Sequence, residues 1–260
     1  MSSEPPQTAD TFDRAETEAG WRQAGWETLA LYAAHNTRYL VNSEDDHTFR
    51  VAYPLAMQAL NQARAGLELY RLGLTHQSVT NARVALEHAI IAQYVRAKGR
   101  PAAHEVRVNL QRRRKANLCD FKEFLTHAPG PTPFPAGLQA ELDAPTFEGK
   151  NLPSTGDICK LFDPTLGLYS VYRQLTTGIH LSVDTVNLYV DLTEDGSVTA
   201  VHAAPSPAVS TSVDLSMGLG WSAVLGAHAV ESLRAEGSRL AEVEAIAARH
   251  RLPPCLTLTG

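Results

Sequence analysis

Two pairs of an arginine and a histidine are the residues of this chain whose types and spacing could do chemistry together. Arg83 and His88 are five positions apart, and Arg173 and His180 are seven positions apart. On a helix, five positions turn the chain by about 500°, which leaves the side chains of Arg83 and His88 about 140° apart. Seven positions complete nearly two turns, so Arg173 and His180 share one face about 10 Å apart, with Thr176 between them.

The second pair predicts a site that binds a phosphate and transfers a proton beside it. A guanidinium offers a fixed fork of donors that matches phosphate oxygens, which suits Arg173. An imidazole takes up and releases protons near neutral pH, which suits His180 as an acid or base. Thr176 lies between them on the same face and could orient either group.

The first pair favours a structural role. Arg83 and Glu87 are four positions apart, which is the spacing of an ion pair on one helix face. The pair borders an apolar stripe, so we expect it to meet a second polar group across the bundle. The sequence therefore predicts a structural polar network of Arg83, Glu87 and His88.

The signatures of metal and nucleotide sites are missing. A carboxylate-bridged metal bundle needs two Glu-x-x-His pairs, and Glu44 with His47, in a polar stretch, is the only match. Neither His-Glu-x-x-His, a Gly-rich phosphate loop, nor Cys-x-x-Cys occurs. The three cysteines share no context and indicate a reducing compartment, with Cys119 expected in the core. We therefore expect no metal and no cofactor.

The charge pattern bears on nucleic acid as a partner. Lys and Arg number 23 against 28 Asp and Glu, a net charge of −5, so the chain is not a general polyanion binder. A local basic run could still attract RNA phosphates. Because consecutive positions point all round a helix, a solvated face is the alternative interpretation. The candidates for RNA binding are Arg107, Arg112, Arg113, Arg114 and Lys115.

Apolar side chains at helical spacing predict the elements that position these residues. The clearest are two helices, from about Pro54 to Gly73 and from a cap at Thr75 or Ser78 to about 98. Their short connection predicts antiparallel packing. In the last long helix, Gly218 and Gly220 are expected to be packing sites. Further helices are expected over about 18–35, 103–127, 166–182, 211–236 and 237–250.

The remaining segments are expected to be irregular or weakly β. Residues 128–164 hold seven prolines and predict a long loop, with one or two helical turns over 154–162. Residues 186–201 predict a short hairpin or a continuation of the preceding helix. Residues 1–15 are expected to be disordered and 253–260 to form a tail. The chain as a whole is expected to be an all-α helical bundle, one domain over 16–252.

One stretch also resembles a known family. It runs from Leu152-Pro-Ser-Thr to Tyr172-Arg-Gln-Leu-Thr-Thr-Gly-Ile-His180. It is similar to a bacterial helical family of uncharacterised function, in which a Pro-Ser start, a Tyr-x-x-Tyr-Arg run and a Leu-Ser-x-x-x-His ending recur. Thr176 stands at the Ser position, and Arg83-x-x-x-Glu87-His88 resembles the first helix pair of that family. The resemblance covers about residues 55–185.

That family in turn resembles the HEPN superfamily, whose active members are metal-independent ribonucleases. The resemblance implies a toxin or phage-defence type of enzyme. His180 would act on the ribose 2′-hydroxyl or the leaving group, Arg173 would hold the scissile phosphate, and the site would form across a homodimer.

The alternative is a non-catalytic helical scaffold or regulatory module that binds a protein or nucleotide partner. In that case His180, Thr176 and Glu87 would form a buried polar network that fixes helix register. The N-terminal residues are polar and acidic, which is not typical of a signal peptide. The most apolar stretch, 217–230, is broken by Ser222 and His228, so no membrane span and a cytoplasmic location are expected.

Overall fold

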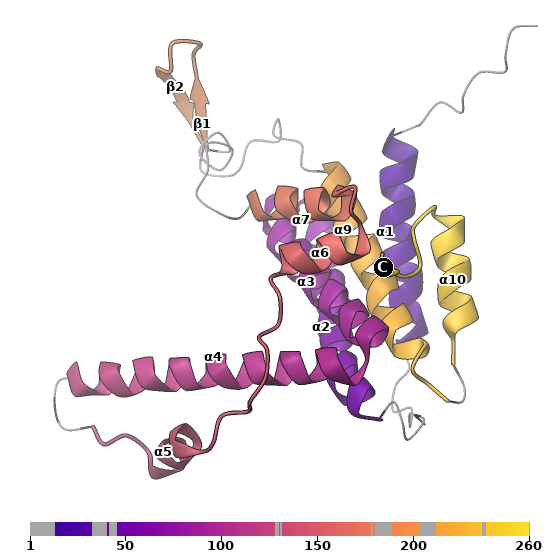
Figure 1. The fold of residues 1–260 in the computed structure, drawn as a ribbon. Helices are drawn as coiled ribbons and strands as arrows, with labels where there is room; N and C mark the ends of the chain where they lie inside the picture. The colour runs from indigo at the N-terminus through magenta and orange to yellow at the C-terminus, as the bar shows by residue number, and fades with distance from the viewer. Residues whose placement is uncertain are drawn as a thin grey trace, which may run out of the picture.

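The computed structural model describes residues 14–32, 41, 46–127, 130, 132–177, 179, 189–202, 212–235 and 238–259. Helices dominate, and two short strands form the only sheet among these residues, so the expected all-α bundle is confirmed (Figure 1). The helices are α1 Arg14–Leu31, α2 Asp46–Arg71, α3 Thr75–Lys98, α4 Arg100–His127, α5 Ala136–Asp143, α6 Thr155–Phe162, α7 Gly167–Thr177, α9 Ser212–Glu231 and α10 Leu240–Arg249.

Helix α9 lies at the centre of the bundle and contacts α1, α2, α3, α7 and α10. It is apolar on nearly all sides, which is the pattern of a helix that is buried all round. Glycines let its neighbours approach closely, as the sequence predicts. A Cβ on Gly220 would overlap the backbone oxygen of Trp21 on α1, and one on Gly218 would lie 2.8 Å from Leu175 on α7.

Helices α2 and α3 form the predicted hairpin and pack extensively against each other. Gly73 ends α2 with a φ of +77°, a conformation that glycine adopts without strain. Neither predicted cap begins α3. Leu74 precedes its first residue without a side-chain cap bond, and the buried Ser78 hydroxyl instead donates to the Gly66 carbonyl on α2 over 2.8 Å. This hydroxyl therefore joins the two helices.

The start of α2 differs from the prediction. The helix begins at Asp46, so Pro54 lies well inside it and not in its first turn. Residues 46–50 before Pro54 are mostly polar, but local pairs support helix there. Asp46 pairs with Arg50 over 2.8 Å, and the rings of Phe49 and Tyr53 stack with centroids 5.3 Å apart.

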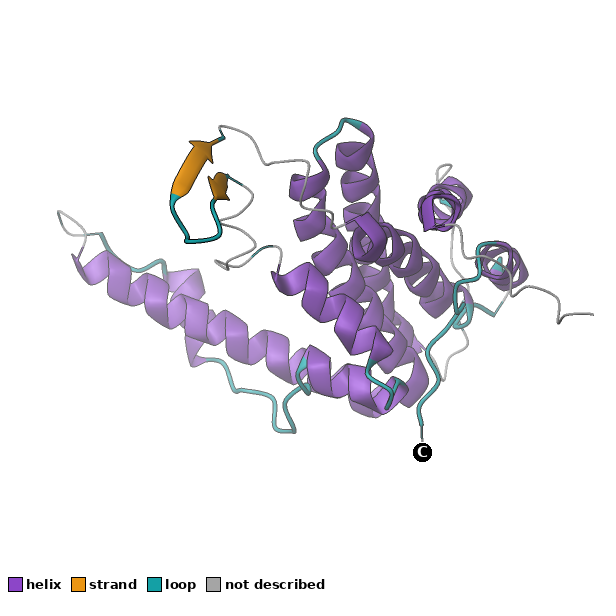
Figure 2. Cartoon of the chain, turned by 90° about the horizontal axis from the view of Figure 1, so that it is seen from above, coloured by secondary structure: helices purple, strands orange, loops and turns teal. Residues whose placement is uncertain are grey.

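Helix α4 is longer than predicted and projects beyond the other helices (Figures 1 and 2). Its apolar side chains at helical spacing do not all pack on the bundle. Val106 and Leu118 are buried, whereas Leu110 and Phe121 are exposed, and Cys119 is exposed instead of lying in the core. Part of this face is covered locally, because the Phe121 ring meets the Phe134 ring at 6.0 Å. We call α4 and the segment 132–151 that returns along it the arm.

The proline-rich segment is more helical than predicted. It contains α5, which the sequence did not predict, and α6, which it did. Ser154 is the N-cap of α6, since its Oγ accepts from the Asp157 backbone N–H over 3.1 Å. The four prolines at 129–135 precede α5, and no proline interrupts that helix.

The predicted hairpin is confirmed as the antiparallel pair β1 Val190–Leu192 and β2 Val198–Val201, which has few contacts with the bundle (Figure 2). The expected extensions of two helices, at 33–35 and 178–182, lie largely outside the described residues, as does most of the N-terminal segment expected to be disordered. Val41 forms an isolated bridge with Arg234. The C-terminal tail packs on the bundle, where Leu256 is buried and the Thr259 N–H donates to the Leu161 carbonyl.

Among the described residues, no helix has both the length and the apolar character needed to cross a membrane.

Candidate functional site

The site begins with the way Asp163 fixes the start of α7. One carboxylate oxygen accepts from the Thr165 N–H over 2.9 Å, and the other accepts from the Leu168 N–H over 2.8 Å. The Thr165 hydroxyl and these backbone donors hold the pKa of Asp163 below its ordinary value. The turn includes Leu166 at a φ of +65°. The carboxylate therefore sets where α7 begins.

Helix α7 buries one face and presents the other. Leu168, Val171 and Leu175, spaced by three and four, are buried against the bundle. Arg173 lies on the opposite side and is exposed, with its guanidinium 6.0 Å from the Tyr169 ring centroid. No described carboxylate pairs with Arg173, so within that part of the chain its charge is free to meet an anion.

Arg83, on α3, joins α3 to α7. Its Nη2 donates to the Tyr172 hydroxyl over 3.0 Å and lies 3.1 Å from a Glu87 carboxylate oxygen. The guanidinium also lies 5.6 Å from the Tyr172 ring centroid. The predicted ion pair of Arg83 and Glu87 is present, and Tyr172 is the second polar group across the bundle. Arg83 Nε is buried and has no hydrogen-bond partner among the described residues.

Thr176 follows one turn after Tyr172, and its hydroxyl donates to the Tyr172 carbonyl over 2.8 Å. This bond holds the Thr176 hydroxyl against its own helix. Arg173 and Thr176 therefore lie beside the cluster of Arg83, Glu87 and Tyr172. His180, the predicted acid or base, and the glycine before it at 178 lie outside the described residues.

His88 does not join this network, because it lies on another side of α3, as the 140° offset from Arg83 predicts. Its Nδ1 is 2.8 Å from the Val84 carbonyl, so this nitrogen carries the proton and donates. His88 also lines a cavity of about 500 Å³ between α2, α3 and α4, together with His47, Arg50 and Arg107. The structure thus separates the first predicted pair into two sites.

The basic run mostly holds the arm together. Arg114 makes two bonds to the Glu141 carboxylate, at 2.8 and 3.2 Å. Arg112 binds the Asn151 side chain and the Gly149 carbonyl, and Lys115 binds the Ala144 carbonyl. These contacts attach the returning segment to α4.

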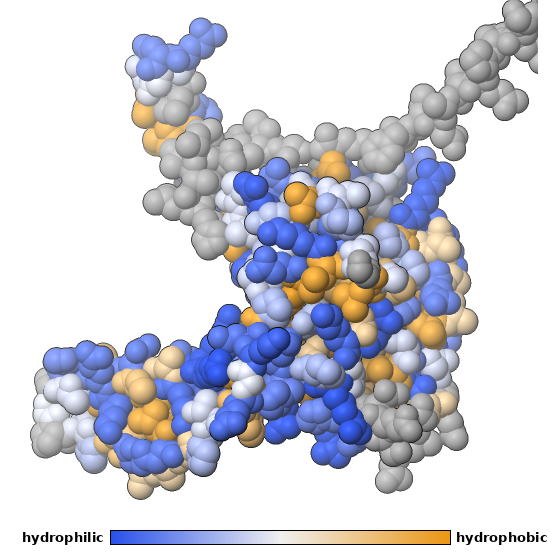
Figure 3. Space-filling model, in the orientation of Figure 1, coloured by the Kyte–Doolittle hydropathy of each residue, from blue (hydrophilic) through white to orange (hydrophobic). Residues whose placement is uncertain are grey.

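The other two predicted RNA-binding residues remain available at the surface. Arg107 lies 4.9 Å from the Phe147 ring centroid, and Arg113 is exposed. Figure 3 shows hydrophilic surface where the arm leaves the bundle and apolar surface farther along it. The five residues therefore do not form one free basic stripe.

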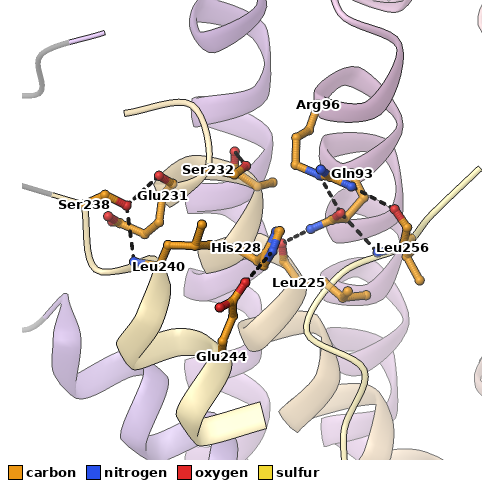
Figure 4. Close-up of polar contacts among 11 residues, drawn as sticks. Gln93, Arg96, Leu225, His228, Glu231, Ser232, Ser238, Leu240, Glu244 and Leu256 are labelled. Atoms are coloured by element: carbon orange, nitrogen blue, oxygen red, sulfur yellow. Dashed lines mark hydrogen bonds and ion pairs between the residues drawn. The ribbon is translucent and has the colours of Figure 1, made fainter. Parts of the chain in front are cut away.

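A second polar network, which the sequence did not predict, lies beneath the C-terminal tail (Figure 4). The buried Gln93 amide donates to the Leu225 carbonyl over 2.7 Å, and its oxygen accepts from Arg96 Nε over 2.9 Å. Arg96 also donates to the Leu256 carbonyl over 2.8 Å. These bonds join α3, α9 and the tail. The signal in the sequence was Gln93, an uncharged polar residue within the apolar part of α3.

Two buried titratable residues on α9 complete this region. Glu231 accepts from the Tyr32 hydroxyl over 2.7 Å and from Arg234 over 2.8 Å. His228 lies 3.8 Å from Glu244, and burial, followed by the positive charge of Arg96, lowers its pKa to about 4. This region is compactly bonded, and we assign it a structural role.

No group of three or more His, Cys, Asp or Glu side chains within the described residues is arranged to hold a metal ion. Comparison of the chain with family models, curated proteins and solved structures found no match.

Proposed function

We propose that this chain is a HEPN-like ribonuclease of the toxin or phage-defence type that cuts RNA without a metal ion, with its site on the exposed side of α7. The observation that carries the proposal is the contact of Arg83 with Tyr172. It joins the two stretches of sequence, on α3 and α7, that carry the family resemblance. Residues 89 positions apart in the chain thus converge beside the exposed Arg173.

The proposed reaction is an attack of the ribose 2′-oxygen on the neighbouring phosphorus. His180 carries out one of the two proton transfers, either accepting the 2′-hydroxyl proton or protonating the leaving 5′-oxygen, and solvent water completes the other, while Arg173 neutralises charge that develops on the phosphate. The new bond joins the 2′-oxygen to phosphorus, and the bond from phosphorus to the 5′-oxygen breaks. The products are a 2′,3′-cyclic phosphate and a free 5′-hydroxyl. Thr176 assists beside the phosphate.

The surroundings of Arg173 support its role as the phosphate ligand. A guanidinium that is already paired with a carboxylate binds a second anion weakly, because its charge is neutralised. Arg83 is paired in this way with Glu87, whereas Arg173 contacts the face of Tyr169, which leaves its charge intact. We therefore assign Arg83 to positioning α7 and Arg173 to the substrate.

The proposal includes a homodimer, because the family resemblance implies a site shared by two copies. The exposure of Arg173 supports this arrangement, since a second α7 and a substrate phosphate can both reach it. Size-exclusion chromatography with light scattering tests the dimer, for which we expect about twice the chain mass of 28.2 kDa.

The decisive experiment is cleavage of a mixed-sequence RNA in EDTA by the full chain and by Arg173→Gln and His180→Ala. We expect each substitution to lower the cleavage rate by at least about a hundredfold. Arg64→Gln, an exposed arginine on α2, is the matched control and should cleave at the wild-type rate. Mass spectrometry of the products should find the 2′,3′-cyclic phosphate.

Two results would overturn the proposal. One is equal cleavage by the wild type and both variants while circular dichroism shows all of them folded. The other is cleavage that stops in EDTA and returns with added magnesium, because the proposed step requires no metal.

A second candidate function is a non-catalytic module that binds a protein or nucleotide. The arm favours a protein partner, because it extends beyond the bundle and exposes Leu110 and Phe124. Substituting Phe124→Ser should leave RNA cleavage unchanged if the first proposal holds. Loss of a binding partner in Phe124→Ser without loss of RNA cleavage would show that the chain has both functions.

A further inference from the structure

The cavity between α2, α3 and α4 has the size and composition of a ligand site. Its volume of about 500 Å³ falls within the range of about 300–1,000 Å³ that small-molecule sites occupy. One part of its wall is aliphatic and consists of Val51, Leu55, Val106 and Leu110. A mostly apolar wall with a few polar groups is the usual construction of a site for a small organic molecule.

The polar part of the wall contains an arginine and two histidines. Arg107, His47 and His88 line it, and none of them has a carboxylate partner among the described residues. Arg50 also lines it but already pairs with Asp46 over 2.8 Å. The Phe147 ring lies 4.9 Å from the Arg107 guanidinium, which orients this charge without neutralising it. The ligand should therefore carry a negative charge.

His88 is set to meet that charge through its second ring nitrogen. The bond from Nδ1 to the Val84 carbonyl fixes the ring, so Nε2 is free to accept in the neutral form or to donate in the charged form. A phosphate presents several oxygens to one guanidinium and to two imidazoles at once, whereas a carboxylate presents two. This arrangement favours phosphate.

Pro54 and Gln58 provide groups that can recognise a second polar end of the ligand, away from its phosphate. Proline has no backbone N–H, so the carbonyl of Arg50 lacks the donor that a helix would normally supply. Arg50, Pro54 and Gln58 all line the cavity. A backbone acceptor and an amide side chain together match the donor and acceptor edge of a nucleobase, while the aliphatic wall matches its ring faces.

From this geometry we infer that the cavity between α2, α3 and α4 binds a nucleoside monophosphate, with Arg107, His47 and His88 at the phosphate. The inference names the ligand of the second candidate function and does not depend on RNA cleavage. The 140° offset between Arg83 and His88 places this cavity on a different side of α3 from the proposed catalytic site.

The test is calorimetric titration of the full chain with AMP, GMP, CMP and UMP, with the four parent nucleosides, and with inorganic phosphate. We expect at least one monophosphate to bind and its nucleoside to bind at least about tenfold more weakly, because the charged contacts are lost. Arg107→Gln should weaken binding at least about tenfold for the same reason. Arg113→Gln, on the same helix outside the cavity, should bind as the wild type does.

Arg173→Gln separates this inference from the proposed function. It should lose RNA cleavage while keeping monophosphate affinity within about twofold. If Arg173→Gln abolished binding and Arg107→Gln did not, the nucleotide would be a product held at α7 and the inference would be wrong. It would also be wrong if the wild type bound none of the four monophosphates, or bound inorganic phosphate as tightly as it bound them. Because Arg107 is exposed, the fold of its variant is expected to persist, and Gln58→Leu is a second variant that should change the preference among bases.

Discussion

The stability of this protein should depend on pH through His228, a histidine on α9 that is only 5% exposed. Burial removes water from the charged imidazolium, and Arg96 on α3 repels it, so the pKa of His228 falls from 6.5 to about 4. Glu244 on α10 would favour the charged form, but it lies 3.8 Å away and is half exposed. Burial and the arginine therefore prevail.

The sign of the effect follows from comparing the two states. In the unfolded chain the imidazole binds a proton below about pH 6.5, whereas in the folded chain it does so only below about pH 4. The stabilising contribution is fully present above pH 6.5 and is lost as the pH falls toward 4. The complete loss is about 3 kcal/mol, since each pKa unit is worth about 1.4 kcal/mol. Between pH 7 and pH 5 the loss is about 2 kcal/mol.

Urea unfolding followed by circular dichroism at pH 7, 6 and 5 measures this contribution. The variant His228→Leu removes the titrating group, and its free energy of unfolding should fall by about 2 kcal/mol less than that of the wild type over this range. Aspartates with lowered pKa, such as Asp163, lose their contribution at lower pH and do not interfere. His127→Leu, at the exposed end of α4, is the matched control and should follow the wild-type curve.

The absolute stability of His228→Leu at pH 7 does not decide the matter. His228 Nδ1 is buried without a hydrogen-bond partner among the described residues, so its removal relieves one cost while the change of shape adds another. The difference between pH 7 and pH 5 is the informative quantity. If the wild type and His228→Leu lose the same free energy over this range, the imidazole titrates normally in the folded protein and the reasoning fails.

Three further predictions concern packing, the link between α3 and α7, and thiol reactivity. Gly220→Ala should destabilise the protein by about 3 kcal/mol in urea unfolding because its Cβ would overlap a backbone oxygen of α1, whereas Gly137→Ala, which meets open space, should be neutral or mildly stabilising. Equal midpoints for the two variants would refute the close approach of α1 to α9. Tyr172→Phe removes a hydrogen bond to the guanidinium on α3 and should cost about 1 kcal/mol in the same assay, and an unchanged midpoint would contradict the link that we describe. The exposed Cys119 should react rapidly with N-ethylmaleimide at pH 7.5. Burial and the nearby Asp163 raise the pKa of Cys159 to about 12, so Cys159 should react only after unfolding. Mass spectrometry of the labelled peptides measures the order, and labelling of Cys159 before Cys119 would contradict this prediction.

The sequence predicts the helical hairpin of α2 and α3 well because its signals are local. An apolar stripe of period 3.6 and a glycine able to adopt a positive φ are sufficient to specify two helices and the turn between them. The sequence predicts α4 less well for a related reason. Its apolar positions have helical spacing, but spacing does not reveal whether a face meets the bundle. Leu110 and Phe121 satisfy the pattern and are exposed.

The proline-rich segment shows how the density of a residue type can mislead. Seven prolines over 128–164 predict irregular structure, yet the two longest gaps between them, 136–144 and 154–163, contain α5 and α6. Proline disfavours helix at the residues before it, because its ring clashes with the preceding turn and it has no N–H to donate, but it does not prevent a helix from starting directly after it. The spacing of the prolines therefore predicts more than their number does.

In the candidate site, the sequence predicts contacts within one helix but not contacts between helices. The ion pair of Arg83 and Glu87 follows from a spacing of four, and the divergence of Arg83 from His88 follows from a spacing of five. The partner of Arg83 is Tyr172 on α7, and His88 faces cavity residues of α4. The spacing of residues within α3 does not predict contacts with these other helices. Helical geometry thus specifies which side chains share a direction, and only the packing of the bundle specifies what they meet. The expected network of Arg83, Glu87 and His88 is therefore divided between two sites. Arg83 and Glu87 lie beside Tyr172, and His88 lines the cavity.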